Sequence, residues 1–234
     1  MKINSHDLLT GPPDGERPVV AVDLEGTLTA GSAWRGMTDY LIDQGREKEA
    51  KRFVMHRLPE YYLRRATGRG MRDFKNRWIY ELLQLFRGYS QAQFQEMTEW
   101  AVENELWPQR RQIVVEELSQ HQEQGRRVIV ATGLFEPYVA SMIARLPGVE
   151  AIGTPIIFED GLLTGRLETP FNIGQRKATA LIPFLQDGRI YAGYGDTEPD
   201  RYMLELCRHP VAVYPDSKLR RLAESNGWRI LEDG

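Results

Sequence analysis

Two acidic residues, Asp23 and Glu25, follow directly on a short apolar run in the stretch VVAVDLEGTLTAG. The run is rich in β-branched residues and too short for a buried helix, so it predicts a buried strand. In open α/β sheets, ligands bind beyond the carboxyl ends of the strands, where these two carboxylates would lie. A carboxylate can attack phosphorus to form an aspartyl-phosphate, and a second one can protonate the leaving oxygen and later activate water. The pair therefore fits a two-step transfer of a phosphoryl group.

Other polar residues stand at positions that would share the same sheet edge. They are Thr132 and Gly133 after RVIVA, Asp196 and Asp200 after RIYAGYG, and Lys177 in the segment before that run. Three acids packed together repel one another, which raises their pKa values unless a cation is present. Mg²⁺ is the natural cation for carboxylate ligands. Mg²⁺ and Lys177 would neutralise a bound phosphate, and the hydroxyl of Thr132 and the amide of Gly133 can hold its remaining oxygens.

The elements that would position these residues alternate between strands and helices. Apolar runs at 18–23, 127–132, 189–196 and 210–215 predict strands, and amphipathic segments at 109–124, 137–146, 175–185, 201–207 and 217–226 predict helices. This alternation predicts a parallel sheet covered on both faces. Residues 153–168 differ, because two β-prone runs flank Asp160 and Gly161, a turn pair suited to a hairpin.

Residues 33–107 show no strand pattern, but their apolar residues repeat at helical spacing. We therefore expect an α/β core domain of residues 1–32 and 108–234, and a helical cap domain of residues 33–107 inserted after the first strand. Within the insert, residues 51–77 carry nine basic and two acidic side chains, a net charge of +7. Such a run is either a solvated helical face or a binding surface. Arg64 in this window is a candidate substrate contact.

Four segments in a fixed order resemble the four motifs of the haloacid dehalogenase (HAD) superfamily. They are DLEGTLT, the Thr-Gly pair after VIVA, the lone Lys177, and GDTEPD. The resemblance covers about residues 18–231, and the insert resembles the C1-type cap of the phosphoserine-phosphatase-like branch, subfamily IB. It implies a Rossmann-like parallel sheet core with the cap after the first strand and a β-hairpin after the helix of the second motif. It also implies an enzyme, a phosphoric monoester hydrolase that uses Mg²⁺ and an aspartyl-phosphate intermediate.

The resemblance also implies roles for individual residues. Asp23 would be the nucleophile and a Mg²⁺ ligand, and Glu25 would give its backbone carbonyl to Mg²⁺ and its side chain to acid/base catalysis. Asp196 would be the other carboxylate ligand of the metal. Asp200 would not bind the metal directly but would orient the phosphate-binding lysine or a metal-bound water. The phosphate itself would be bound by Thr132, Gly133 and Lys177.

Two features depart from the usual pattern of the family. The usual second acid is Asp, and the extra methylene of Glu25 moves the carboxyl by about one C–C bond, roughly 1.5 Å. A displacement near 1 Å can cost about 100-fold in rate unless the site adapts. Glu25 is therefore either a working acid in a reshaped site or a disabling change. Ser32 and Pro199 replace the Glu and Asn that phosphoserine phosphatases carry there, which counts against phosphoserine as the substrate.

The composition of the chain indicates which class of protein it belongs to and in which compartment it is expected. The 234 residues are 41% hydrophobic and 27% charged with a net charge of −3, which predicts a soluble globular protein without a nucleic-acid or membrane partner. Cys207 is the one cysteine, so no disulfide can form within the chain, which fits a cytoplasmic protein. No apolar run approaches the roughly 20 residues of a membrane span.

These observations predict a cytoplasmic, Mg²⁺-dependent phosphatase acting on a small phosphorylated substrate that the sequence does not identify. One alternative is a phosphotransferase that passes the phosphoryl group to an acceptor alcohol. A second is a metal-free hydrolytic dehalogenase, against which Asp196 and Asp200 argue. A third is a phospho-ligand-binding protein disabled by Glu25, against which the retained Asp23 and Lys177 argue. The sequence predicts no oligomeric state.

Overall fold

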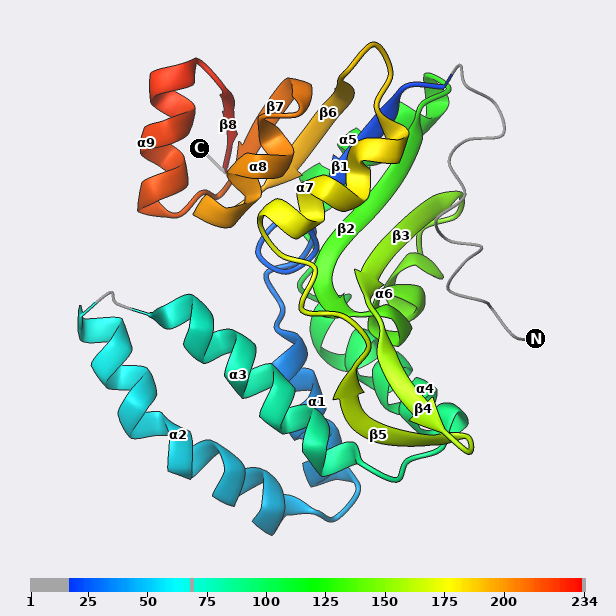
Figure 1. Cartoon of the computed structure of the whole chain (residues 1–234), viewed down its shortest axis with the longest axis vertical. Coiled ribbons are helices and arrows are strands. Elements are labelled where there is room, and N and C mark those ends of the chain that lie inside the picture. Colours follow the sequence, from blue (N-terminus) through cyan, green and yellow to red (C-terminus); the bar gives the residue numbers. More distant parts are fainter. Residues whose placement is uncertain (1–16, 68–69, 233–234) are drawn as a thin grey trace.

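The computed structural model describes residues 17–67 and 70–232 and centres on a six-stranded parallel sheet (Figure 1). The strands lie in the order β3-β2-β1-β6-β7-β8. Their bounds are Val19–Val22 for β1, Arg127–Phe135 for β2, Val149–Thr154 for β3, Ile190–Gly195 for β6, Cys207–Val213 for β7 and Arg229–Leu231 for β8. The parallel sheet predicted from the sequence is confirmed. Residues 1–16 of the predicted core domain lie outside the described part of the chain.

The pattern of apolar runs does not predict two of these strands, β3 and β8. β3 is an edge strand whose Glu150 is exposed and pairs with Arg127 of β2 at 2.7 Å, so a polar residue interrupts its apolar run. β8 has three residues, of which Leu231 is buried. A strand this short leaves no alternation to recognise.

The predicted hairpin is confirmed as β4 (Ile156–Glu159) and β5 (Leu162–Leu167), which pair antiparallel. Asp160 and Gly161 connect them with φ angles of 51° and 77°. A two-residue hairpin turn of this kind requires positive φ at both positions, which Asp and Gly adopt more easily than most residues.

Helices cover both faces of the sheet because successive strand residues point to opposite sides. In β1, Val20 and Val22 lie in one apolar core, and Val19 and Ala21 lie in the other. The first core is covered by α5 (Gln112–Glu123) and α6 (Glu136–Ile143). The second is covered by α7 (Gln175–Leu181), α8 (Arg201–Leu204) and α9 (Ser217–Asn226). In Figure 1, α7 and α8 lie in front of the sheet.

Helices also form the insert between β1 and β2. They are α1 (Ala33–Asp43), α2 (Glu47–Thr67), α3 (Met71–Leu83), a 3₁₀ turn (Gln84–Phe86), α4 (Gln91–Ala101) and a π-helical turn (Val102–Leu106). The described residues 33–67 and 70–107 contain no strand. The helical insert after the first strand is therefore confirmed, whereas its boundaries as a separate domain stay a prediction.

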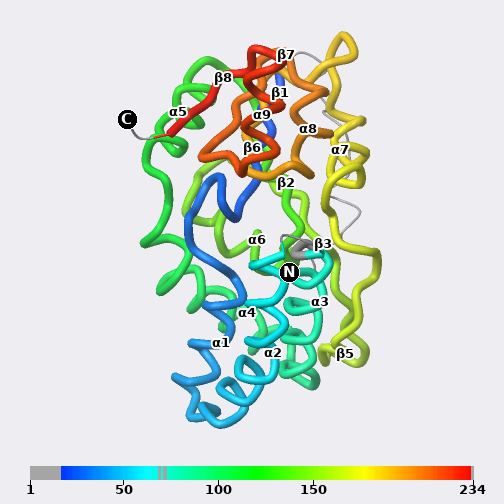
Figure 2. Tube along the Cα trace, turned by 90° about the vertical axis from the view of Figure 1, so that its left-hand side faces the viewer, coloured from blue at the N-terminus to red at the C-terminus, as the bar shows by residue number. Residues whose placement is uncertain are grey.

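The insert is anchored to the sheet through α4. Thr98 Oγ1 lies 2.8 Å from Ser141 Oγ on α6, and the ring of Phe94 packs against that of Phe135 on β2. By contrast, α2 and α3 lie side by side away from the sheet (Figures 1 and 2). No helix in the described residues, the 21-residue α2 included, is long and apolar enough to cross a membrane.

A partly buried polar network ties α5 to β6. The hydroxyl of Tyr194 donates to Glu117 at 2.8 Å, so its oxygen accepts from His121 Nε2 at 2.9 Å. His121 Nδ1 in turn accepts from Arg126 Nη1 at 2.9 Å. An accepting Nδ1 requires the neutral imidazole, whereas Nε2–H can donate in either protonation state. Burial and the neighbouring charge of Arg126 accordingly lower the pKa of His121.

This network predicts that the protein loses stability as the pH falls below about 6.5. The unfolded chain protonates His121 near its ordinary pKa of 6.5, while the folded chain resists protonation. The contribution is therefore present above pH 6.5 and is lost as the pH falls through the lower folded pKa. Urea unfolding of the wild type and of His121→Gln, measured from pH 8 to pH 5, isolates this residue from the other titrating groups. Parallel pH profiles for the two proteins would contradict the prediction.

Candidate active site

The carboxyl ends of three neighbouring strands bring the predicted site residues to one edge of the sheet. β1 lies between β2 and β6, with Val22 opposite Val130 on one side and Tyr194 on the other. Asp23 follows β1, and its amide donates to the carbonyl of Tyr194 at 2.9 Å. Since parallel strands end at the same edge, Thr132 near the end of β2 and Asp196 after β6 lie on the same side.

Lys177 of α7 joins this edge and lies between two carboxylates. Its Nζ donates to Asp23 Oδ1 and to Asp200 Oδ1, both at 2.6 Å, and the side chain is 2% exposed. Burial opposes the charge on Lys177, but the charges of Asp200 and Asp23 raise its pKa above the usual value. Asp200 is itself held by the amide of Thr197 at 3.1 Å and its hydroxyl at 3.0 Å. Lys177 is therefore a fixed positive charge beside Asp23.

Three carboxylates form a cluster around this lysine. Oxygen atoms of Asp23, Asp196 and Asp200 all lie within 4.8 Å of one another. Burial raises the pKa of Asp196 to about 8 and that of Asp23 to about 6, and mutual repulsion adds to both. One ammonium cannot neutralise three carboxylates, and an all-oxygen cluster of this kind fits Mg²⁺.

The turn after β1 brings its backbone close to this cluster. Gly26 has a φ of 92°, and a Cβ on it would lie 2.0 Å from Asp196 Oδ2. A glycine is therefore required at this position. Thr27 follows, and its hydroxyl donates to Asp196 Oδ1 at 3.2 Å. Thr27 stands inside the first motif, but the sequence predicts no role for it, because nothing in its spacing distinguishes it from an ordinary turn residue.

Glu25 follows Asp23 by two residues, and its side chain reaches the helical insert. Its Oε1 accepts a hydrogen bond from the amide of Ala33, the first residue of α1, at 2.7 Å. Burial raises the pKa of Glu25 to about 7, although this hydrogen bond and the charge of Lys75 act in the opposite direction. The extra methylene of Glu25 is thus used to reach the N-terminus of α1, where a carboxylate is favoured.

Arg64, the candidate substrate contact, lies near the end of α2. Its Nε donates to Glu60 at 2.7 Å and its Nη1 to the carbonyl of Gly70 at 3.1 Å. Its role in substrate binding stays a prediction. Lys75 on α3, which is not among the residues predicted from the sequence, is the cation of the insert whose charge acts on Glu25. No sequence signal identifies it, since its position depends on how α3 packs over α1.

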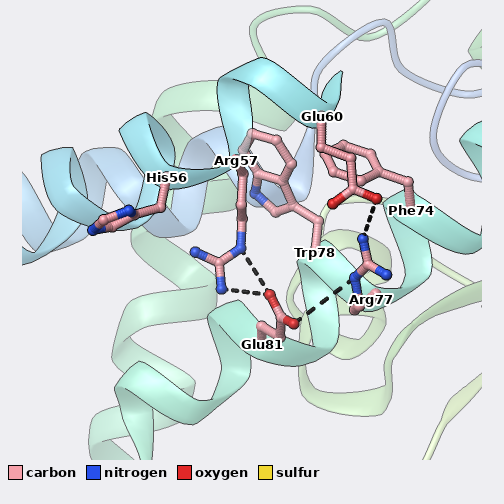
Figure 3. Close-up of a pocket in the computed structure, with 7 residues that line it drawn as sticks. All are labelled: His56, Arg57, Glu60, Phe74, Arg77, Trp78 and Glu81. Atoms are coloured by element: carbon pink, nitrogen blue, oxygen red, sulfur yellow. Dashed lines mark hydrogen bonds and ion pairs between the residues drawn. The ribbon is translucent and has the colours of Figure 1, made fainter. Parts of the chain in front are cut away.

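The cleft between α2 and α3 is lined by two of the nine basic residues of the window, Arg57 and Arg77, and both are paired with carboxylates (Figure 3). Arg57 Nε donates to Glu81 at 2.8 Å, and Arg77 pairs with Glu60 and lies 3.9 Å from Glu81. Because each of these cations already has a carboxylate partner, the cleft offers little net charge to a phosphate. This part of the window therefore behaves as a paired helical surface.

Comparisons with known proteins find similarity along much of the chain. The family model described as haloacid dehalogenase-like hydrolase matches residues 20–205. The phosphoserine phosphatase SerB1 of Mycobacterium tuberculosis is 29% identical over 140 residues, which cover 58% of this chain and 44% of that protein. A histidinol-phosphatase of Neisseria meningitidis is 27% identical over 224 residues, 89% of this chain and 96% of that protein.

A solved structure has a similar fold along nearly the whole chain. It is a protein of unknown function from Bordetella pertussis Tohama I, with a TM-score of 0.77 and 24% identity, covering 92% of this chain and 98% of that one. The match to the mycobacterial phosphatase spans less than half of that protein's length. These comparisons agree with the fold.

Proposed function

The chain belongs to the haloacid dehalogenase-like hydrolases, and from this premise we propose that it is a Mg²⁺-dependent phosphatase of small phosphomonoesters. The observation that carries the proposal is the buried Asp23 at the end of β1, 2.6 Å from the ammonium of Lys177 and clustered with Asp196. An attacking carboxylate at this position would have the ammonium of Lys177 beside it, and a transferring phosphoryl group needs such a positive charge. The phosphatase names of the mycobacterial and neisserial relatives support the same reaction class.

The metal would be held by the carboxylates of Asp23 and Asp196 and by the backbone carbonyl of Glu25. When bound, it supplies positive charge that neutralises the carboxylate cluster and the phosphate. The raised pKa values of Asp23 and Asp196 support this assignment, because they express a repulsion that a cation would relieve.

In the first half-reaction, Asp23 attacks the phosphorus and the ester P–O bond breaks. Glu25, in its protonated form, gives its proton to the leaving alkoxide, so that an alcohol departs and Asp23 carries the phosphoryl group. In the second half-reaction, the Glu25 carboxylate takes a proton from a water molecule as that water attacks the phosphorus. Inorganic phosphate leaves and Asp23 is restored. A pKa of about 7 suits Glu25 to both tasks near neutral pH.

Phosphate release from a panel of phosphomonoesters tests the proposal. The purified protein is assayed with Mg²⁺, with and without acceptor alcohols, and the variant Asp23→Asn is assayed in parallel. Release of inorganic phosphate from at least one ester by the wild type alone is expected. Formation of a new phosphate ester in place of free phosphate would instead identify a phosphotransferase. No release from any ester, or equal release by the variant, would contradict the proposal.

The carboxylate cluster predicts an effect of Asp196→Asn on stability. A carboxyl whose pKa rises from 3.8 to about 8 on folding destabilises the fold progressively as the pH rises between these values. Removing this charge should therefore raise the unfolding temperature of the metal-free protein at pH 8 by roughly 2–4 °C, the shift that about 1 kcal/mol causes in a chain of this size. At pH 4 the gain should be small.

The same variant should lose the stabilisation that Mg²⁺ gives the wild type, since a ligand that binds the folded state raises its unfolding temperature. Thermal unfolding with and without Mg²⁺ measures both effects. Asp187→Asn is the matched control, because Asp187 is an exposed loop residue paired with Arg208 and lies outside the cluster. A lower unfolding temperature for metal-free Asp196→Asn, or an unchanged response to Mg²⁺, would contradict the prediction.

A further inference from the structure

The end of β2 departs from regular pairing where the candidate phosphate-binding residues lie. Ala131 is paired with Ile152 of β3, and the next paired residue of β2 is Phe135, opposite Thr154. Three residues of β2 therefore lie opposite one residue of β3. The three are Thr132, Gly133 and Leu134. Such a bulge interrupts the ladder and redirects backbone and side-chain groups, and bulges are frequent next to active sites.

Two buried side chains bind the carbonyl groups of this bulge. Asn172 Nδ2 donates to the carbonyl of Thr132 at 3.2 Å, and Thr154 Oγ1 donates to the carbonyl of Gly133 at 2.8 Å. The two residues are linked, because the backbone N–H of Asn172 donates to Thr154 Oγ1 at 3.0 Å. Asn172 and Thr154 are 8% and 0% exposed, so water does not replace these bonds.

Because these bonds fix the direction of the Thr132 and Gly133 carbonyls, they also fix the direction of the backbone N–H groups of the same two peptides, those of Gly133 and Leu134. The described chain has no cis peptide, so in each peptide the N–H points opposite to the C=O. The amide of Gly133 therefore points away from Asn172, and the amide of Leu134 points away from Thr154 and toward Thr132 Oγ1, 3.3 Å distant. β3 lies on one side of β2 and β1 on the other. Asn172 Nδ2 also donates to the carbonyl of Ile152 on β3 at 3.4 Å, so both bulge carbonyls are bound from the β3 side and the two amides are turned the other way.

The segment that contains Asn172 continues directly into α7, the helix that carries Lys177. Gly174, with a φ of 58°, precedes α7, and Lys177 is its third residue. Asn172 therefore stands five residues before the ammonium that contacts Asp23. A single short stretch of chain sets the position of the bulge and of Lys177 relative to each other.

We propose that Asn172 and Thr154 are positioning residues for phosphate binding. They hold the bulge so that the Gly133 amide and the Thr132 hydroxyl face the phosphoryl group on Asp23. This inference rests on the proposed function, because it takes that group to be the ligand of the bulge. The two residues touch neither the phosphate nor the metal; they act through the carbonyls that they bind.

The test uses the full-length protein with Mg²⁺ and inorganic phosphate as the probe. Thr154→Val removes the hydroxyl with little change in shape, and Thr154→Ser restores it. Thr164→Val is a matched control, because Thr164 Oγ1 donates to the Ile157 carbonyl at 2.9 Å in the β4–β5 hairpin. We expect Thr154→Val to weaken phosphate binding and lower kcat/KM by about 10-fold each, the factor for one hydrogen bond. Thr154→Ser and Thr164→Val should stay close to wild type.

Two further measurements separate positioning from general damage. The affinity for Mg²⁺ should be unchanged in Thr154→Val, because Asp23 and Asp196 follow β1 and β6 rather than β2. Amide hydrogen exchange at Gly133 and Leu134 should be faster than in the wild type. Wild-type protein that binds no phosphate would overturn the proposed function itself. A Thr154→Val variant that binds phosphate as tightly as the wild type does would overturn the positioning role alone.

Discussion

Asp23→Asn is expected to lower kcat by on the order of 10⁴- to 10⁶-fold, the cost of removing a catalytic nucleophile. An amide nitrogen or oxygen in place of the carboxylate cannot form the acyl-phosphate on which both half-reactions depend. Asn has nearly the same size as Asp, and Lys177 keeps its 2.6 Å contact with Asp200. The variant should therefore fold, since the buried ammonium retains a carboxylate partner.

Steady-state rates on one phosphomonoester, together with circular dichroism of the variant, measure this effect. Deamidation of the introduced asparagine would regenerate the wild-type residue, so the mass of the protein is checked before and after the assay. Lys177→Met provides a comparison in which the nucleophile remains but its cation is lost. A folded, chemically intact Asp23→Asn variant that retained Mg²⁺-dependent turnover would show that another group attacks the phosphorus.

The position of Asp23 and Asp196 could be predicted because parallel strands gather their carboxyl ends at one edge. Acidic residues that follow two neighbouring parallel strands are brought together by the sheet topology, independently of the conformation of the connecting loops. Lys177 was also predictable, since it lies in the first turn of the helix that precedes the strand before Asp196. These positions depend on strands and helices with strong periodic patterns.

Other features of the site depend on packing and could not be predicted in this way. The contact of Glu25 with Ala33 requires knowing where α1 begins relative to the turn after β1. The bonds of Asn172 and Thr154 to the β2 bulge involve side chains that replace ladder partners. The residues that make such bonds do not recur at a regular spacing, so the sequence does not reveal them. The edge strand β3 was missed for a related reason, because a polar residue interrupts its apolar run.

The contact between Glu25 and α1 leads to the second large effect. Glu25→Gln should slow the transfer from an alkyl phosphate by roughly 10²- to 10⁴-fold, the usual range for a positioned proton donor. Gln keeps the length of the side chain and can still accept from the Ala33 amide. A loss of rate would therefore measure the missing proton transfer to the leaving oxygen. A nitrophenyl phosphate should be affected much less in the first step, because its leaving group scarcely needs protonation. Slowing of both substrates to the same extent would indicate a structural role for Glu25.

Glu25→Asp is the sharper test of why this acid is longer than usual. In the wild type, Oε1 lies 2.7 Å from the amide nitrogen of Ala33. Shortening the side chain withdraws the carboxyl by roughly 1.5 Å, which breaks this bond and displaces the proton from the leaving oxygen. A displacement of about 1 Å can cost about 100-fold, so we expect a loss of that order although the variant restores the usual acid. A clear gain in rate would show that Glu25 is a damaged remnant.

Ala33→Pro tests the same contact from the side of the donor. Ala33 is the first residue of α1, a position where proline is tolerated because its amide has no partner within the helix. Ser32 before it is extended, with φ −132° and ψ 122°, as a residue before proline must be. The variant loses the hydrogen bond to Glu25, and because the Ala33 side chain is fully buried, thermal unfolding is measured alongside to correct the rate for any loss of folded protein. If the amide positions the acid, Ala33→Pro slows the alkyl phosphate about as much as Glu25→Asp, and combining the two changes adds little further loss. Full activity of Ala33→Pro would mean that Glu25 reaches its working position without α1.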